Sequence, residues 1–180
     1  MTLARAAFLD RDGVINVEKN YVHRIADFEF IPGVLEACRR IAEAGYLLII
    51  VTNQAGIARG YYGEPEFAAL TRWMSARFAD AGAPLAAVYH CPHHPEATLP
   101  GLRKACDCRK PEPGLILRAA REHSLDLGHS LLVGDKRSDI EAGRRAGVGR
   151  CFLIEQTAAT DGATGAEVVR SLSEVAERIA

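Results

Sequence analysis

Apolar residues gather in short runs along the chain, and segments with helical spacing separate one run from the next. A short, continuous apolar run predicts a strand that is covered on both faces of its sheet. Such runs lie at Ala6–Leu9, Tyr46–Val51, Ala86–Tyr89, Ser130–Val133 and Cys151–Ile154. Apolar residues three and four positions apart, bounded by proline or glycine, predict helices. These helices cover residues 34–44, 65–81, 113–124, 138–146 and 168–179, and a polar loop is expected over 156–165.

The alternation of strands and helices predicts the fold class. We expect an α/β protein with a Rossmann-like, doubly wound and mainly parallel sheet that carries helices on both faces. No internal repeat or linker interrupts the pattern, so a single domain over residues 1–180 is expected. The segment His90–Pro113 is too long and irregular for an ordinary connection, and it contains three of the six histidines and three of the five cysteines.

Composition and charge exclude several classes of protein. The chain has 180 residues, of which 48% are hydrophobic and 25% charged, and its formal net charge is −1. These values are typical of a globular domain and give no electrostatic reason to expect nucleic acid as a partner. No apolar run approaches the ~20 residues that span a membrane, and residues 3–9 do not have the pattern of a signal peptide. We therefore expect a cytoplasmic protein, a monomer, without a membrane or nucleic-acid partner.

Polar residues with possible chemistry follow four of the five predicted strands. They are Asp10–Gly13, Thr52–Gln54, Arg109–Lys110 and Gly134–Asp139. Because the carboxyl ends of parallel strands lie along one edge of a sheet, we expect these four segments to meet.

Three of these residues are carboxylates that would converge from separate loops: Asp10, Asp12 and Asp135. Converging carboxylates repel one another unless a cation lies between them, and a small set of oxygen ligands suits Mg²⁺. Such a site needs an anionic substrate, typically a phosphate. The alternative is that Asp10 and Asp12 are solvated turn residues and that Asp135 caps a helix.

The remaining strand-end residues fit phosphoryl chemistry. Thr52 and Lys110 offer a hydroxyl donor and an ammonium group for two phosphoryl oxygens, although they could also be a chain cap and a solvated loop lysine. Asp10 directly follows its strand, which favours it as a nucleophile that forms an aspartyl-phosphate. Asp12 would then act as the general acid and base, because only one of two nearby carboxylates is readily protonated.

A second group of residues predicts a metal loop over residues 91–110. Cys91, His93, Cys106 and Cys108 form a set of three sulfurs and one imidazole that suits a closed, structural Zn²⁺ site. His94 is a competing nitrogen ligand, and free thiols or a disulfide are the alternatives to a metal. Cys38 and Cys151 lie on apolar faces and are expected to be buried in the core.

Four motifs in order resemble those of phosphatases of the haloacid dehalogenase superfamily. They are FLDRDGVI at Phe8–Ile15, Val51–Gln54, Lys110, and the Gly134-Asp135 pair with Asp139. The resemblance implies a Rossmann-like fold and Mg²⁺, with Asp10 as nucleophile and Asp12 as acid and base. It further implies a metal contact from the Asp12 backbone carbonyl, Asp135 as a metal ligand, and Asp139 as a supporting carboxylate that orients Lys110.

Further runs resemble a branch of this superfamily that removes a phosphate from a sugar bisphosphate. These runs are residues 21–23, 28–30, 53–60, 91–95 and 106–111. The resemblance implies a small-molecule sugar phosphate as the substrate, zinc on the Cys/His set, and a group of substrate contacts: Glu18, Lys19, Asn20, Tyr21, Asn53, Gln54, Ala55 and Arg109. Ala55 departs from the pattern, in which serine is frequent, and this puts only a side-chain contact in doubt.

Two alternative functions share part of this pattern. Histidinol-phosphate phosphatases have the same motifs and zinc loop, but with a shorter span between the Cys-x-His and Cys-x-Cys pairs. A non-catalytic, zinc-ordered binding domain is a second alternative, and the complete set of strand-end residues argues against it. No connection is long enough to hold a cap domain, so a capless enzyme with an open site is expected.

Overall fold

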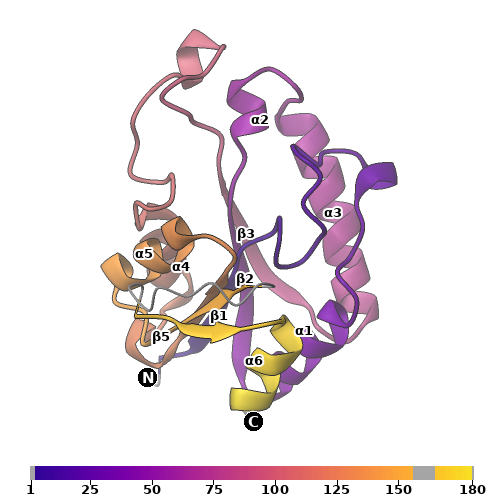
Figure 1. Cartoon of the computed structure of the whole chain (residues 1–180), viewed down its shortest axis with the longest axis vertical. Coiled ribbons are helices and arrows are strands. Elements are labelled where there is room, and N and C mark those ends of the chain that lie inside the picture. The colour runs from indigo at the N-terminus through magenta and orange to yellow at the C-terminus, as the bar shows by residue number, and fades with distance from the viewer. Residues whose placement is uncertain (1–2, 156–164, 180) are drawn as a thin grey trace.

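A computed structural model describes residues 3–155 and 165–179 as a six-stranded parallel sheet with helices (Figure 1). The strands follow the order β3-β2-β1-β4-β5-β6 and pair in parallel throughout. Their bounds are β1 Arg5–Leu9, β2 Tyr46–Asn53, β3 Leu85–Cys91, β4 Leu131–Gly134, β5 Arg150–Ile154 and β6 Glu167–Val169. The helices are α1 Val34–Glu43, α2 Ala55–Ala58, α3 Glu64–Asp80, α4 Gly114–His123, α5 Arg137–Ala146 and α6 Leu172–Ile179. The predicted doubly wound α/β fold is therefore confirmed.

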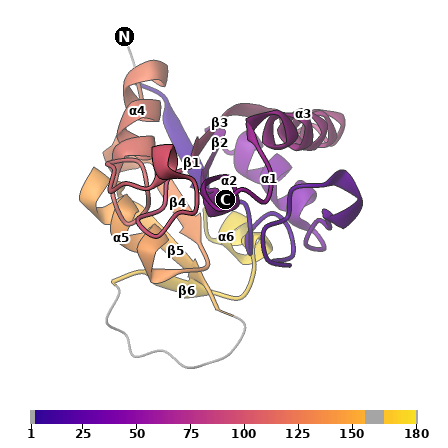
Figure 2. The ribbon, with the colours of Figure 1, turned by 90° about the horizontal axis from the view of Figure 1, so that it is seen from above.

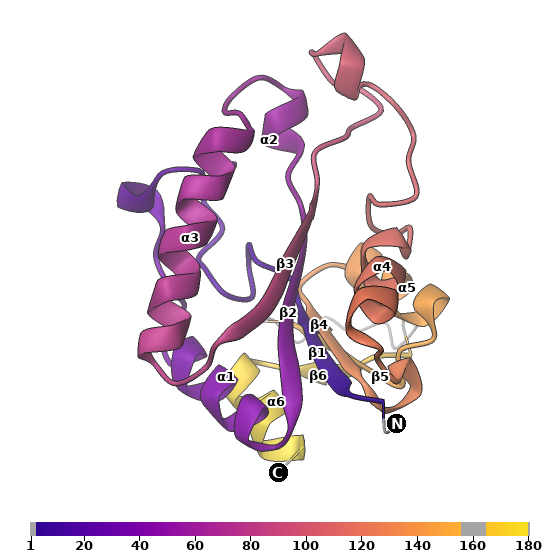
Figure 3. The ribbon, with the colours of Figure 1, turned by 180° about the vertical axis from the view of Figure 1, so that it is seen from behind.

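The helices form a layer on each face of the sheet. Helices α1, α3 and α6 cover one face, and α4 and α5 cover the other (Figures 2 and 3). Alternate residues of β1 point into the two layers, with Ala7 and Leu9 in one apolar core and Ala6 and Phe8 in the other. Because both faces are covered, the buried middle of each central strand is apolar, as in Ala6–Leu9 and Leu48–Val51, which is why continuous apolar runs predicted them.

Two short elements differ from the sequence-based expectation. Residues 167–169 form an edge strand beside β5, and the last helix begins only at Leu172, so its predicted start at 168 was wrong. A run of three residues is too short to distinguish a strand from the first turn of a helix. The four-residue helix α2 was not predicted. The loop expected over 156–165 lies, apart from Gly165, outside the described residues.

The topology brings the site residues to one edge of the sheet. The chain winds outward from β1 to β3 and then returns to β4 on the other side of β1, so the order of strands reverses between β1 and β4. Ligands bind at such a switch point, beyond the carboxyl ends of the strands. The segment after β3 rises above this edge (Figure 1) and contacts the end of α2, where the Leu99 backbone N–H donates to the Ala58 carbonyl at 3.0 Å. None of the described helices is long and apolar enough to cross a bilayer.

The central strand β2 offers a matched test of the core. Ile49 is completely buried, whereas Leu47, two residues earlier, is 37% exposed. We expect Ile49→Ala to lower the free energy of unfolding by about 2–5 kcal/mol, because it removes buried methyl groups and leaves a cavity. Leu47→Ala should cost less than about 1 kcal/mol. Urea unfolding measures both, and equal losses would contradict the assigned packing.

Candidate active site

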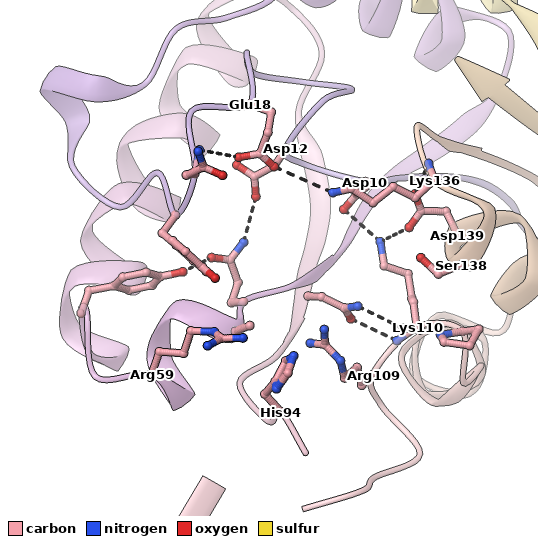
Figure 4. Close-up of a pocket in the computed structure, with 17 residues that line it drawn as sticks. Asp10, Asp12, Glu18, Arg59, His94, Arg109, Lys110, Lys136, Ser138 and Asp139 are labelled. Carbon is pink, nitrogen blue, oxygen red and sulfur yellow. Dashed lines mark hydrogen bonds and ion pairs between the residues drawn. The ribbon is translucent and has the colours of Figure 1, made fainter. Parts of the chain in front are cut away.

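A buried lysine joins two carboxylates where the order of strands reverses. The Nζ atom of Lys110 lies 2.9 Å from Oδ1 of Asp10 and 2.6 Å from Oδ1 of Asp139. It also donates to the backbone carbonyl of Val51 at 2.8 Å. All three charged residues are buried (Figure 4). The structure thus brings together Asp10, Lys110 and Asp139 from β1, the loop before α4, and the first turn of α5.

Local contacts hold each member of this group in place. The side chain of Asn53 pairs with the backbone of Lys110, accepting from its N–H at 3.0 Å and donating to its carbonyl at 3.2 Å. The Asp139 carboxylate accepts from the backbone N–H of Lys136 at 3.1 Å. A Cβ atom on Gly134 would lie only 2.2 Å from the Cβ of Asp139, so only glycine leaves room for this approach.

Burial and charge act in opposite directions on these groups. Burial raises the pKa of Asp10, the nearby Asp139 raises it further, and the positive charge of Lys110 opposes both. Burial works against the charge on Lys110, but the two carboxylates outweigh it and raise the pKa of the ammonium group. Lys110 therefore stays charged, and its charge favours the ionised form of Asp10 that a nucleophile requires.

A cluster of carboxylate oxygens beside Lys110 has the composition of a cation site. Asp10, Asp135 and Asp139 each offer an oxygen, and these oxygens lie within 4.8 Å of one another. The Oδ1 atom of Asp135 is buried and has no hydrogen-bond partner among the described residues. Gly13 has φ +88°, and a Cβ there would lie 2.2 Å from Oδ2 of Asp135. The orphaned oxygen and the close carboxylates fit a hard divalent cation.

The side chain of Asp12 does not join this cluster. Its carboxylate is bound by Arg11, from Nη2 at 2.9 Å and Nε at 3.2 Å, and by Asn16 at 3.0 Å. The amide nitrogen of Gln54 donates to Oδ2 of Asp12 at 3.2 Å and to Oγ1 of Thr52 at 2.9 Å. Asp12 is therefore oriented by three side chains, and its backbone lies two residues beyond Asp10, just after the end of β1.

A cavity of about 540 Å³ opens over these groups (Figure 4). It is lined by seven of the eight residues expected to contact substrate: Glu18, Asn20, Tyr21, Asn53, Gln54, Ala55 and Arg109. The eighth, Lys19, is not part of the lining and instead forms an ion pair with Glu29 at 2.7 Å. Thr52 lies buried beneath the cavity floor rather than along it.

The two ends of the cavity carry opposite charge. The carboxylates lie at one end, and three basic side chains, Arg59, His94 and Arg109, gather at the other (Figure 4). Burial lowers the pKa of His94, and the charges of Arg109 and Arg59 lower it further, which shows that these cations are close enough to interact. Their combined field favours an anionic group at this end of the cavity.

The four predicted zinc ligands converge in the segment after β3. The Sγ atom of Cys91 lies 2.9 Å from that of Cys108 and 3.5 Å from that of Cys106. Nδ1 of His93 lies 3.4 Å from the sulfur of Cys108, and all four ligand atoms fall within 4.8 Å of one another. His94, the competing nitrogen, instead accepts a hydrogen bond from the Glu96 backbone. None of the five cysteines forms a disulfide, and Cys38 and Cys151 are buried as expected.

Sequence reasoning missed several lining residues. Arg59, Tyr62, Lys136 and Ser138 border the cavity but were not assigned to it, and His94 was considered only as a zinc ligand. Arg59 lies within the run at residues 53–60 that carried the family resemblance, which is the one signal that pointed to it. The others depend on how the loops turn, and no spacing in the sequence shows that.

The parallel sheet, the buried Asp–Lys–Asp group at its switch point and the adjoining acidic cluster define a haloacid dehalogenase-like phosphatase. The HAD-hydrolase-like family model matches residues 107–175. The chain belongs to the family of D-glycero-D-manno-heptose-1,7-bisphosphate 7-phosphatases, because it is at least 30% identical to several members over most of their length.

Three comparisons illustrate the relationship. The chain is 52% identical over 165 residues to a D-glycero-alpha-D-manno-heptose-1,7-bisphosphate 7-phosphatase of Burkholderia mallei, covering 92% of this chain and 87% of the relative. It is 43% identical over 177 residues to the beta-named enzyme of Yersinia pestis, covering 97% and 94%. The crystal structure of D,D-heptose 1,7-bisphosphate phosphatase from B. bronchiseptica, complexed with magnesium and phosphate, has a TM-score of 0.83 and 30% identity, covering 97% of each chain.

The buried ion group predicts a pH-dependent loss of stability. In Lys110→Met, Asp10 and Asp139 would be buried without a counter-charge, and we expect the free energy of unfolding at about pH 8 to fall by about 3–5 kcal/mol. Without Lys110, the pKa of Asp10 in the folded variant rises further above its ordinary value of 3.8. The folded form then binds a proton more readily than the unfolded chain, so the variant should regain stability as the pH falls through that raised pKa.

Urea unfolding at a series of pH values in magnesium-free buffer measures this effect. Lys136→Met is the matched control, because that lysine is 56% exposed and should cost little. A loss in Lys110→Met that stays constant from pH 8 to pH 5 would contradict the assigned role of its charge.

Proposed function

We propose that the chain is a Mg²⁺-dependent phosphatase that removes the 7-phosphate of D-glycero-D-manno-heptose 1,7-bisphosphate. The observation that carries this proposal is the cavity with phosphoryl-transfer residues at one end and Arg59, His94 and Arg109 at the other. A substrate with two phosphates can use both ends. The names of relatives that are 43% and 52% identical support the same substrate, and the product would supply the synthesis of ADP-heptose for lipopolysaccharide.

The chain's own residues suit a two-step displacement. A carboxylate oxygen of Asp10 attacks phosphorus, the bond from phosphorus to the sugar oxygen breaks, and Asp12 gives its proton to the leaving alkoxide. Asp12 then accepts a proton from a water molecule that attacks the aspartyl-phosphate, which releases inorganic phosphate and restores Asp10. Lys110, which lines the cavity, binds a phosphoryl oxygen through both steps. Thr52 is the predicted second donor, and because it is buried outside the lining, its hydroxyl would reach a phosphoryl oxygen only after a local rearrangement. A Mg²⁺ ion held by Asp10, Asp135 and the Asp12 backbone, with Asp139 in support, would neutralise the charge of the phosphoryl group.

The basic end of the cavity distinguishes between the two candidate substrates. Histidinol phosphate has one phosphate, and its other end carries an ammonium group and an imidazole. Arg59 and Arg109 would repel that ammonium group, whereas they attract the second phosphate of a bisphosphate. A non-catalytic binding domain is disfavoured because it would not need a buried, ion-paired carboxylate such as Asp10.

We further propose that the Cys/His cluster holds a structural Zn²⁺. Tetrahedral zinc with Zn–S distances of about 2.3 Å places its sulfur ligands about 3.8 Å apart, and the sulfurs here are already 2.9–3.5 Å apart. Four protein ligands close the coordination shell, so the metal would order the segment rather than take part in the reaction. That segment carries His94 and Arg109, so zinc would also fix the basic end of the cavity. We keep as predictions that the protein is a single domain, that it is cytoplasmic and monomeric, and that it has no nucleic-acid or membrane partner.

A substrate comparison tests the proposed function. With Mg²⁺ present, we expect kcat/KM for heptose 1,7-bisphosphate to exceed that for histidinol phosphate by about 100-fold or more, since only the bisphosphate pairs with the basic end. Phosphate release is measured for both substrates, and for the α and β anomers, because the relatives differ in this part of their names. Arg59→Ala should raise KM for the bisphosphate more than for a monophosphate. Faster hydrolysis of histidinol phosphate would overturn the substrate assignment.

Asp10→Asn tests the assigned nucleophile. The amide cannot form the aspartyl-phosphate, so turnover should be lost, while the circular dichroism spectrum and the folded state are retained. Retained phosphate release by this variant would contradict the assignment.

Removal of zinc should affect stability more than chemistry. Lys110 is held by Asn53, Asp10 and Asp139 independently of the metal cluster, whereas Ala97 is the one buried residue in the segment 92–108. We expect a zinc chelator, followed by dialysis and restored Mg²⁺, to lower the melting temperature and speed proteolysis in this segment, with a smaller change in kcat. Re-addition of zinc is the control, and protein purified without chelator but found free of zinc would rule out the site.

A further inference from the structure

We propose that Tyr62 is a positioning residue for the reaction: its hydroxyl fixes the amide of Gln54, and that amide orients the carboxylate of Asp12. The inference rests on the proposed role of Asp12 as the acid and base. Tyr62 is far from the metal cluster in the sequence and belongs to none of the motifs that pointed to a phosphatase.

A continuous chain of hydrogen bonds connects the three side chains. The hydroxyl of Tyr62 donates to Oε1 of Gln54. Nε2 of the same amide donates to Oδ2 of Asp12 at 3.2 Å. Tyr62 and Gln54 are both buried, so water competes little for these bonds.

The amide of Gln54 can satisfy its partners in one orientation only. If it were reversed, Oε1 would face the carboxylate oxygen of Asp12, and two acceptors would repel each other. The hydroxyl of Tyr62 supplies the donor that Oε1 needs on the opposite side. Burial raises the pKa of Tyr62, so this hydroxyl keeps its proton and remains a donor. Without it, Oε1 would be buried and unpaired, which favours rotation of the whole amide away from Asp12.

Close contacts also fix the position of the Tyr62 ring. The ring of His23 stacks on it with centroids 4.8 Å apart and planes 6° apart. A Cβ atom on Gly56 would lie 2.2 Å from Cε1 of Tyr62 and 2.9 Å from its hydroxyl. The absence of a side chain at Gly56 thus gives the ring the space in which its hydroxyl reaches Gln54.

Asp12 needs such an orienting partner on this side. Arg11 and Asn16 bind both of its oxygens from the other side, at 2.9–3.2 Å. An acid and base must present one oxygen toward the substrate, and Gln54, which lines the cavity, is the partner that binds Asp12 from the substrate side. Loss of this contact should slow the chemical step more than it weakens substrate binding, because the other expected substrate contacts are retained.

The test compares Tyr62→Phe with Tyr61→Phe. Both changes remove one hydroxyl, but Tyr61 is 57% exposed and lies outside the cavity lining. We expect Tyr62→Phe to lower kcat for heptose bisphosphate by about five- to tenfold, with KM within about twofold of the wild type. Tyr61→Phe should leave both parameters unchanged. A purely structural role for Tyr62 would lower the melting temperature without this separation of kcat from KM.

A double-mutant cycle shows whether Tyr62 acts through Gln54. In a Gln54→Ala background, Tyr62→Phe should change kcat by less than about twofold, because its partner is gone. Gly56→Ala, which pushes the ring aside while the hydroxyl is retained, is a second variant and should lower kcat as Tyr62→Phe does. The proposal would be overturned if Tyr62→Phe lowered kcat by the same factor with and without Gln54. It would also be overturned if Tyr62→Phe had the kcat of the wild type. Absence of turnover in the wild-type protein would overturn the proposed function instead.

Discussion

The ammonium group of Lys110 between Asp10 and Asp139 is the interaction on which the rest of the site depends. Three charges are buried together there, and each alone would cost several kcal/mol to remove from water. Their mutual attraction offsets that cost only if the distances are short. The fold therefore has to hold three separate loops within hydrogen-bond distance of one another. In a parallel sheet, loops meet in this way where the order of strands reverses, which here is between β1 and β4.

The same group explains why the site can be both stable and reactive. One ammonium group shared by two carboxylates leaves the region with a surplus of negative charge, to which the orphaned oxygen of Asp135 adds. A divalent cation bound there would relieve that surplus, and the cation and Lys110 together would attract a phosphate. The same charges that the fold buries are therefore the ones that the proposed metal and substrate would balance. At the far end, Arg59 and Arg109 form no ion pair with another described residue, so their field would be available to a second anionic group.

Residues that the sequence could identify are those fixed by position relative to a strand. Asp10 and Asp135 directly follow buried strands, and Thr52 is the penultimate residue of β2, so an assignment of strands in a parallel sheet is enough to place all three at the same edge. The Cys/His set was predictable for a different reason, because its spacing is itself a chemical pattern. Tyr62, His94 and Arg59 lie on loops whose path is set by tertiary contacts, such as the bond between Leu99 and Ala58. Periodicity carries no information about such contacts, and β6 was missed because three residues show no period.

Glycines in the sequence give some information about these tertiary contacts. Gly13, Gly56 and Gly134 each leave space for a functional side chain, namely that of Asp135, Tyr62 or Asp139, at distances where a Cβ would collide. Each of these glycines lies within a few residues of a strand end, so it marks a place where another loop comes close to the backbone. The glycine at position 56 thus predicts that some side chain packs closely against the residues after Thr52, but it does not predict which side chain. The identity depends on which loop packs there, and here it is the turn carrying Tyr62, whose hydroxyl donates to Gln54, the residue that in turn donates to Asp12.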